Sequence, residues 1–97
     1  SDQFIRKYGA VSPQVARAMA EGIKKRSSSD IGVGITGIAG PTGATTEKPV
    51  GLVYIAVVVD DVAEVKECRF RGSRIDIKNF SANTALNMLR LKFMDNC

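Results

Sequence analysis

The sequence predicts an α/β fold in which a mixed sheet of about three strands is layered between two helices, as part of something larger. Three observations support this class. Residues 12–26 carry apolar side chains at helical spacing, residues 49–59 form an apolar run of strand length, and residues 75–93 return to helical spacing. Such a sheet is thin for a domain, so we expect further strands or another subunit beside it.

The first predicted helix begins at Ser12 and ends near Arg26. Ser12 can cap the helix, and Pro13 suits its first position, where no N–H partner is needed. Apolar side chains then recur every four residues, at Val15, Met19 and Ile23. The basic residues 24–26 fall in the last turn, where cations complement the helix dipole. We therefore interpret this basic triplet as a helix end.

Three strands follow. Residues 31–36 alternate glycine with Ile or Val and predict a short strand whose glycines allow another backbone to come close. Residues 49–59 are apolar on both faces, which predicts a central strand. After the turn signal Asp60-Asp61, residues 62–70 mix apolar and charged side chains, as an edge strand does. The short link predicts that the second and third strands pair antiparallel.

The last predicted helix begins after Ser73, which with Asp76 approximates a capping box. Its apolar positions form two stripes: Ile77, Phe80, Thr84, Met88 and Leu91 in one, and Ala82, Leu86, Leu89 and Phe93 in the other. So wide an apolar sector predicts burial against the sheet and a second contact, with another helix or another subunit.

Composition narrows the class of protein. The 97 residues are 44% hydrophobic and 25% charged, as in ordinary globular domains. No apolar run could cross a bilayer, no secretory leader opens the chain, and the two cysteines, Cys68 and Cys97, have no CxxC spacing. We expect a reduced, cytoplasmic protein without a membrane contact. The absence of histidine argues against a zinc site, and the scattered bases behind the net charge of +4 argue against nucleic-acid binding.

The stretch GITGIAGPTGATTEKP, residues 34–49, places a glycine at every third position from Gly34 to Gly43. Glycines let successive backbone N–H groups point inward and hold a phosphate or a developing oxyanion. Thr36 stands at the end of the preceding strand, where side chains reach the cleft of an α/β sheet. The spacing fits neither a P-loop nor a dinucleotide fingerprint. A plain flexible connection is the alternative interpretation.

Four motifs carry a resemblance to a known family: YGAVS at residues 8–12, TGIAGP at 36–41, EKPVG at 47–51 and FRGSR at 70–74. Together they resemble the C-terminal domain of the competence/damage-inducible CinA proteins. The resemblance implies that residues 1–97 are part of a larger α/β/α CinA-like domain. It also implies hydrolysis of nicotinamide mononucleotide to nicotinic acid mononucleotide and ammonia, without metal or organic cofactor. Separately, a thin sheet that lacks neighbouring strands would expose apolar surface, so we expect a homo-oligomer.

One departure limits the transfer of catalytic residues. The family carries its serine nucleophile in an ESCTGG-like stretch and its tyrosine and lysine in a YSNxxK-like stretch, and neither string occurs here. The resemblance therefore places the nucleophile and the base upstream of Ser1. We expect this chain to be a partial domain that holds the binding half and is inactive by itself.

The remaining matches define a candidate substrate site. Thr36 and the backbone of Gly37, Ile38, Ala39 and Gly40 match the family's site-lining loop and could orient the amide or stabilise charge on its oxygen. Arg74 matches the family arginine near the nucleotide, and its planar donor fork suits a phosphate. Alternatively, Thr36 bonds backbone at a strand end and Arg74 is a solvated first-turn residue. Glu47 and Lys48 could pair with each other or reach a ligand, but we favour their interpretation as solvated loop residues.

Three functions stay open on these grounds. The first is an amidase, of which this chain is the carboxy-terminal part. The second is a non-catalytic module that binds a nucleotide or assembles subunits. The third, nucleic-acid binding, has the least support, because the basic residues do not gather in one stretch.

Overall fold

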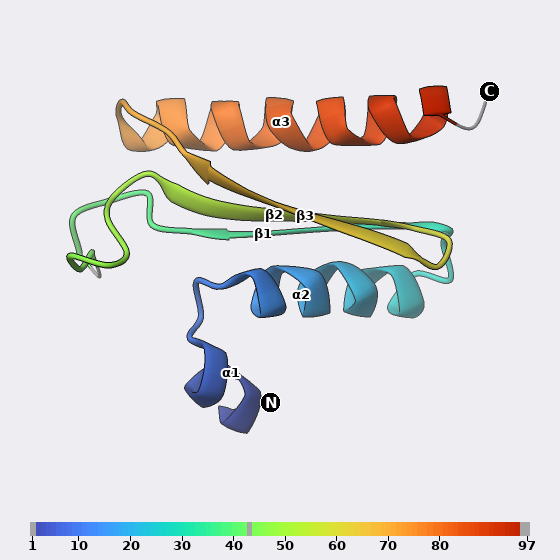
Figure 1. Cartoon of the computed structure of the whole chain (residues 1–97), viewed down its shortest axis with the longest axis horizontal. Coiled ribbons are helices and arrows are strands. Elements are labelled where there is room, and N and C mark those ends of the chain that lie inside the picture. The colour runs from blue at the N-terminus through green and yellow to red at the C-terminus, as the bar shows by residue number, and fades with distance from the viewer. Residues whose placement is uncertain (1, 43, 96–97) are drawn as a thin grey trace.

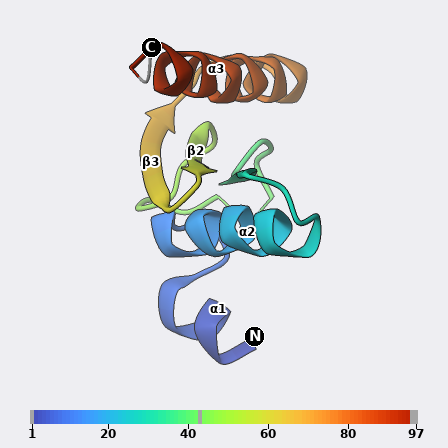
Figure 2. The ribbon, with the colours of Figure 1, turned by 90° about the vertical axis from the view of Figure 1, so that its right-hand side faces the viewer.

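The computed structural model describes residues 2–42 and 44–95. The elements follow in the order α1 (Asp2–Tyr8), α2 (Pro13–Arg26), β1 (Ile31–Gly37), β2 (Leu52–Val59), β3 (Val62–Arg69) and α3 (Arg74–Asp95). The sheet lies between α2 on one face and α3 on the other, and α1 extends beyond α2 (Figures 1 and 2). The predicted helix–sheet–helix layering is therefore confirmed.

The strands lie in the order β1-β2-β3. Both pairings are antiparallel, with Thr36 opposite Tyr54 and Tyr54 opposite Glu67. The predicted antiparallel pairing of β2 with β3 is confirmed. A mixed sheet was also predicted, but the described strands form no parallel pair. The reason is that neither connection contains the crossover helix that a parallel pair requires.

Alternating glycines bring α2 onto β1. A Cβ atom added to Gly32 would stand 2.0 Å from the carbonyl oxygen of Ala20, and one added to Gly34 would stand 2.2 Å from that of Ala16. Both alanines are completely buried. Small residues on both elements let the two backbones touch, as the glycine spacing predicted.

Strand β2 is central, as its two apolar faces predicted. Val53, Ile55, Val57 and Val59 belong to the core cluster on the α3 side of the sheet. Ala56 and Val58 belong to the second cluster, on the α2 side. Successive β2 residues thus serve opposite cores, because side chains alternate across a strand.

Helix α3 has the predicted capping box, since the Ser73 amide donates to Asp76 Oδ2 at 2.9 Å and the Asp76 amide donates to Ser73 Oγ at 3.1 Å. Its buried positions are Ile77, Ser81, Ala85 and Met88. The predicted stripe was therefore wrong in its middle, where small residues at helical spacing face the sheet in place of Phe80 and Thr84. Large apolar side chains remain exposed along the helix: Ile75, Phe80, Leu86, Leu91, Phe93 and Met94.

Helix α1 was not predicted. The rings of Phe4 and Tyr8, one helical turn apart, lie 4.9 Å from centroid to centroid. Gly9 ends the helix with φ at 82°, and its N–H donates to the Ile5 carbonyl at 2.6 Å. The Phe4/Tyr8 spacing followed by glycine is the signal that would have identified this helix. None of the helices in residues 2–42 and 44–95 combines the length and apolar character needed to cross a membrane.

Candidate functional site

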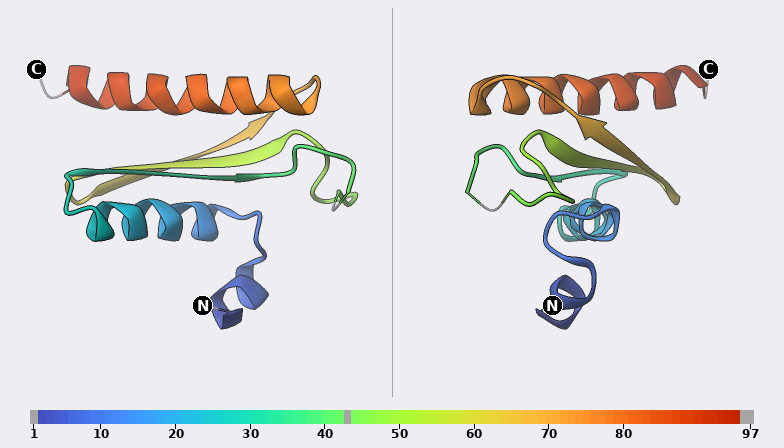
Figure 3. Two further views of the ribbon diagram at one scale, coloured as in Figure 1. Left: turned by 180° about the vertical axis from the view of Figure 1, so that it is seen from behind. Right: turned by 60° about the vertical axis from the view of Figure 1, so that its left-hand side comes forward.

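The four motifs meet at one end of the sheet. There the connection 38–51 bends around the ends of β1 and β2, between the α1–α2 link and the start of α3 (Figure 3). We call this region the loop end. The turn between β2 and β3 and the link from α2 to β1 lie at the opposite end (Figure 1). Segments far apart in sequence are thus brought to one place by the antiparallel order of the strands.

Thr36 points to the α2 side of the sheet. Its Oγ1 donates to the carbonyl oxygen of Ala10 at 2.7 Å, which ties the end of β1 to the α1–α2 link. Thr36 therefore bonds backbone at the strand end, as the alternative interpretation proposed. The oxygen keeps its acceptor lone pairs, so a ligand N–H could still bind it; a substrate role stays a prediction.

Two of the predicted loop amides remain available. Ile38 is fully engaged, because its N–H donates to the Leu52 carbonyl at 2.9 Å and its carbonyl accepts from the Gly51 N–H at 2.7 Å. The N–H groups of Ala39 and Gly40 donate to no acceptor in residues 2–42 and 44–95. Ala39 and Gly40 therefore supply the loop N–H groups that a ligand could still use.

Arg74 lies directly beside this pair of amides. A Cβ atom added to Gly40 would stand 3.8 Å from Nη2 and 3.9 Å from Nε of Arg74. The guanidinium pairs with no carboxylate among the described side chains. Arg74 is also the first residue of α3, whose N-terminal end carries a partial positive charge. Free amides, a guanidinium and a helix end together favour a negatively charged or strongly polar ligand atom.

An apolar hollow of about 260 Å³ opens next to these donors, on the α3 side of the sheet. Its walls include Ile35, Gly37, Ala39, Val53, Ile77 and Ser81. Since neighbouring strand residues face opposite ways, Gly37 lines the hollow while Thr36 faces away from it. The predicted residues thus divide between the two faces of the sheet. Gly37, Ala39, Gly40 and Arg74 lie on or near the α3 side, and Thr36 lies on the α2 side.

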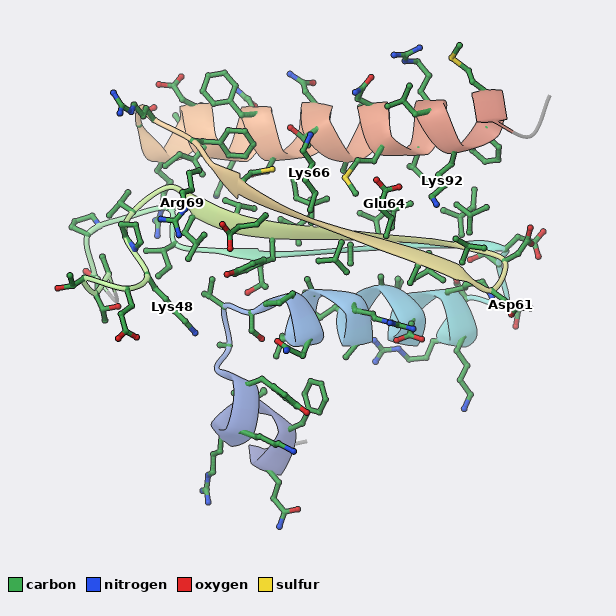
Figure 4. All side chains as sticks on the ribbon, viewed as in Figure 1. Lys48, Asp61, Glu64, Lys66, Arg69 and Lys92 are labelled. Carbon is green, nitrogen blue, oxygen red and sulfur yellow. The ribbon has the colours of Figure 1, made fainter. Side chains whose placement is uncertain are left out.

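Lys48 is a residue whose position sequence reasoning missed. A Cβ atom added to Gly9 would stand 2.6 Å from Lys48 Nζ, so the ammonium group occupies the space that the glycine leaves. Figure 4 shows the side chain reaching from the connection 38–51 to the α1–α2 link. Lys48 as a whole is half-buried. Only the spatial meeting of YGAVS with EKPVG reveals this contact, and a distance of nearly forty residues hides it in the sequence.

Cys68 and Tyr54 are two further reactive side chains, and neither is a ready nucleophile or base. Cys68 is buried, and burial raises the pKa of its thiol, consistent with an inert strand residue. Burial, together with the hydrogen bond from its hydroxyl to Glu67 Oε1 at 2.9 Å, raises the pKa of Tyr54. No group of three His, Cys, Asp or Glu side chains gathers to hold a metal within the described residues. Cys97 lies outside them.

Comparison with known proteins gives a consistent result. Residues 1–93 match the family described as the CinA C-terminal domain. A CinA-like protein of Acidobacterium capsulatum is 51% identical over 92 residues, which is 95% of this chain, and one of Koribacter versatilis is 54% identical over 91 residues. This chain spans only 22% of the length of each of these relatives.

Solved structures agree in fold. A competence/damage inducible protein from Agrobacterium tumefaciens superposes with a TM-score of 0.88 at 39% identity, over 94% of this chain and 56% of that one. A competence damage-inducible protein from Klebsiella pneumoniae superposes with a TM-score of 0.90 at 26% identity, over 97% of this chain and 58% of that one. The family match, the curated relatives and the solved structures all cover the residues that carry the four motifs. The chain therefore belongs to the CinA C-terminal domain family.

Proposed function

We propose that this chain supplies the substrate-binding half of a nicotinamide mononucleotide amidohydrolase. In that reaction water replaces the amine of the carboxamide, giving nicotinic acid mononucleotide and ammonia. The nucleophile and the base come from polypeptide outside these residues. The chain by itself binds the nucleotide without turning it over.

The observation that carries this proposal is the position of Arg74 beside Gly40, next to two unengaged amides and an apolar hollow. A pyridine ring is flat and apolar on its faces, and it suits walls built from Ile35, Val53 and Ile77. The carboxamide oxygen gains negative charge when it is attacked, and fixed N–H donors stabilise that charge. The amides of Ala39 and Gly40, with the guanidinium, are donors of this kind.

Calorimetry with nicotinamide mononucleotide tests the binding half directly. The 97-residue chain should bind it and release no ammonia. Arg74→Met should weaken binding about tenfold or more, because a charge-assisted hydrogen bond contributes about 1.5–3 kcal/mol. Arg71→Met removes an equal charge from an exposed neighbour outside the hollow and should leave binding unchanged.

Ammonia release tests the other half of the proposal. The longest natural form of the protein that carries this chain should hydrolyse nicotinamide mononucleotide. Turnover by the 97-residue chain would place the reacting groups within it and contradict the division of labour. Absence of both binding and turnover would remove the amidase proposal.

A second candidate function is assembly of subunits without chemistry. The exposed apolar side chains of α3, among them Ile75 and Leu86 at 70% and 64% exposure, favour it. Burying them against a second copy would release water from apolar surface and stabilise an oligomer. Sedimentation at several concentrations tests this candidate, and a strictly monomeric chain would exclude it.

A further inference from the structure

We infer that Lys48 binds the phosphate group of the nucleotide and sets the preference for a phosphorylated substrate over its nucleoside. This inference rests on the proposed function and assigns one of its contacts. It replaces the sequence-based interpretation of Lys48 as a solvated loop residue.

The backbone around Lys48 is held in a defined turn. The Lys48 N–H donates to Thr45 Oγ1 at 2.9 Å, and the Thr45 N–H donates to the Lys48 carbonyl at 2.9 Å. Pro49 follows and fixes its own φ angle. The backbone of Lys48 is therefore held by two hydrogen bonds to Thr45.

The ammonium group ends against backbone that has no side chain. Gly9 has φ at 82°, and a Cβ atom there would stand 2.6 Å from Nζ. The glycine thus serves two needs, the left-handed turn after α1 and the room for the lysine head. The positive φ angle restricts this position to glycine, whereas the flexible lysine could move away from an added Cβ atom.

Among the side chains that the structure describes, this ammonium group has no counter-ion. No ion pair joins it to a carboxylate there, and its sequence neighbour Glu47 is exposed. Arg6 and Lys7 occupy the last turn of α1, just before Gly9 in the sequence. An ammonium group without a counter-ion is stabilised when an anion binds.

Lys48 and Thr36 meet on the same two residues of the α1–α2 link. Nζ of Lys48 lies at Gly9, and the Thr36 hydroxyl bonds the carbonyl of Ala10. Arg74 lies at Gly40, next to the hollow on the other side of the sheet. The two cations therefore flank the TGIAGP loop from opposite sides. Because Arg74 is grouped with the hollow and the free amides, we assign it to the carboxamide end and Lys48 to the phosphate end.

The experiment compares nicotinamide mononucleotide with nicotinamide riboside, which lacks only the phosphate. Calorimetric dissociation constants are measured with the 97-residue chain, which on the proposed function binds the mononucleotide without hydrolysing it. The wild type should prefer the mononucleotide. Lys48→Met should weaken mononucleotide binding about 10- to 100-fold and leave riboside binding unchanged. Lys48→Arg should retain most of the preference, and Lys25→Met, which removes an exposed cation at the far end of α2, should retain all of it.

Each other outcome overturns the inference in a recognisable way. If Lys48→Met keeps the preference and Arg74→Met loses it, the phosphate belongs to Arg74. If Lys48→Met weakens both ligands equally, the lysine only supports the loop. If the wild type binds neither ligand, both the proposed function and this assignment fall. Thermal unfolding of each variant shows that the fold is kept, so a loss of affinity is not mistaken for unfolding.

Discussion

The hydroxyl of Thr36 donates a 2.7 Å hydrogen bond to the carbonyl oxygen of Ala10, 26 residues earlier in the chain. This bond joins the end of the edge strand β1 to the link between α1 and α2. The bond is formed at the same place where Lys48 reaches Gly9. Thr36 therefore holds the loop end together irrespective of any contact with a ligand.

Two substitutions of Thr36 should distinguish the contribution of this hydrogen bond to stability from the contribution of side-chain volume. Thr36→Val keeps the shape and loses the donor, and it should lower the free energy of unfolding by about 1 kcal/mol. Thr36→Ser keeps the hydroxyl and should lie closer to the wild type. Urea denaturation measures both. Equal stability of the two variants would show that the hydrogen bond contributes nothing.

The contact between α2 and β1 should tolerate no added atom. Gly34→Ala would place a methyl group 2.2 Å from a backbone oxygen and should destabilise the fold by about 2–3 kcal/mol. Gly22→Ala is the matched control, since its methyl group would meet only the flexible end of Arg26 at 3.6 Å. It should stabilise α2 by about 0.5–1 kcal/mol. Denaturation curves that rank the two variants in reverse would contradict the close packing.

The cap of α3 should matter for stability and for the position of Arg74. Ser73→Ala removes the acceptor for the Asp76 amide and should cost about 1 kcal/mol. Asn79→Ala, on the exposed side of the same helix, should be neutral or slightly stabilising because alanine is the better helix former. Thermal unfolding distinguishes them. A Ser73→Ala protein as stable as the wild type would mean that the cap is dispensable.

Tyr54 should make stability fall at high pH. Burial and the hydrogen bond to Glu67 raise its pKa above the ordinary 10.0 in the folded chain. The stabilisation is complete below about pH 10 and is lost as the pH rises through the folded-state pKa. Relative to Tyr54→Phe, the wild type should thus lose stability only above about pH 10. Glu67→Gln should reduce that dependence; parallel curves for all three proteins would refute the assignment.

The outer surface of α3 should govern self-association. Leu86 is 64% exposed, so Leu86→Gln should leave the free energy of unfolding within about 0.5 kcal/mol while reducing association. Met19→Gln makes a similar change at an exposed position on α2 and should leave association as in the wild type. Analytical ultracentrifugation at matched concentrations makes the comparison. Equal association of both variants would assign the contact to another surface.

Local signals predicted most of the fold. Ser12 accepts from the Val15 amide as an N-cap, and residues 13–26 form the helix that its apolar spacing predicted. The β2–β3 turn and the capping box of α3 are also where short motifs place them. These elements depend on neighbours within four residues or on a tight turn, which a sequence displays directly.

What the sequence concealed depends on distance along the chain. The burial of Ser81 and Ala85 in place of Phe80 reflects how closely α3 approaches β2, which periodicity alone does not reveal. The separation of Thr36 from Gly37 onto opposite faces follows from strand pleating once the strand reaches Gly37. The position of Lys48 was missed because Gly9, which its ammonium group approaches, lies far away in sequence, in the link between α1 and α2.

The Asp60–Asp61 turn has a practical consequence. It lies at the opposite end of the sheet from the loop end, with Asp60 at a φ of 53° and the neighbouring side chains exposed (Figure 4). Replacement of Asp60 by glycine would relieve the left-handed strain there, and a short tag inserted after Asp61 would project into solvent. A fluorophore or a surface tether attached at that corner would let ligand binding be followed without touching the groups that we propose to contact the ligand.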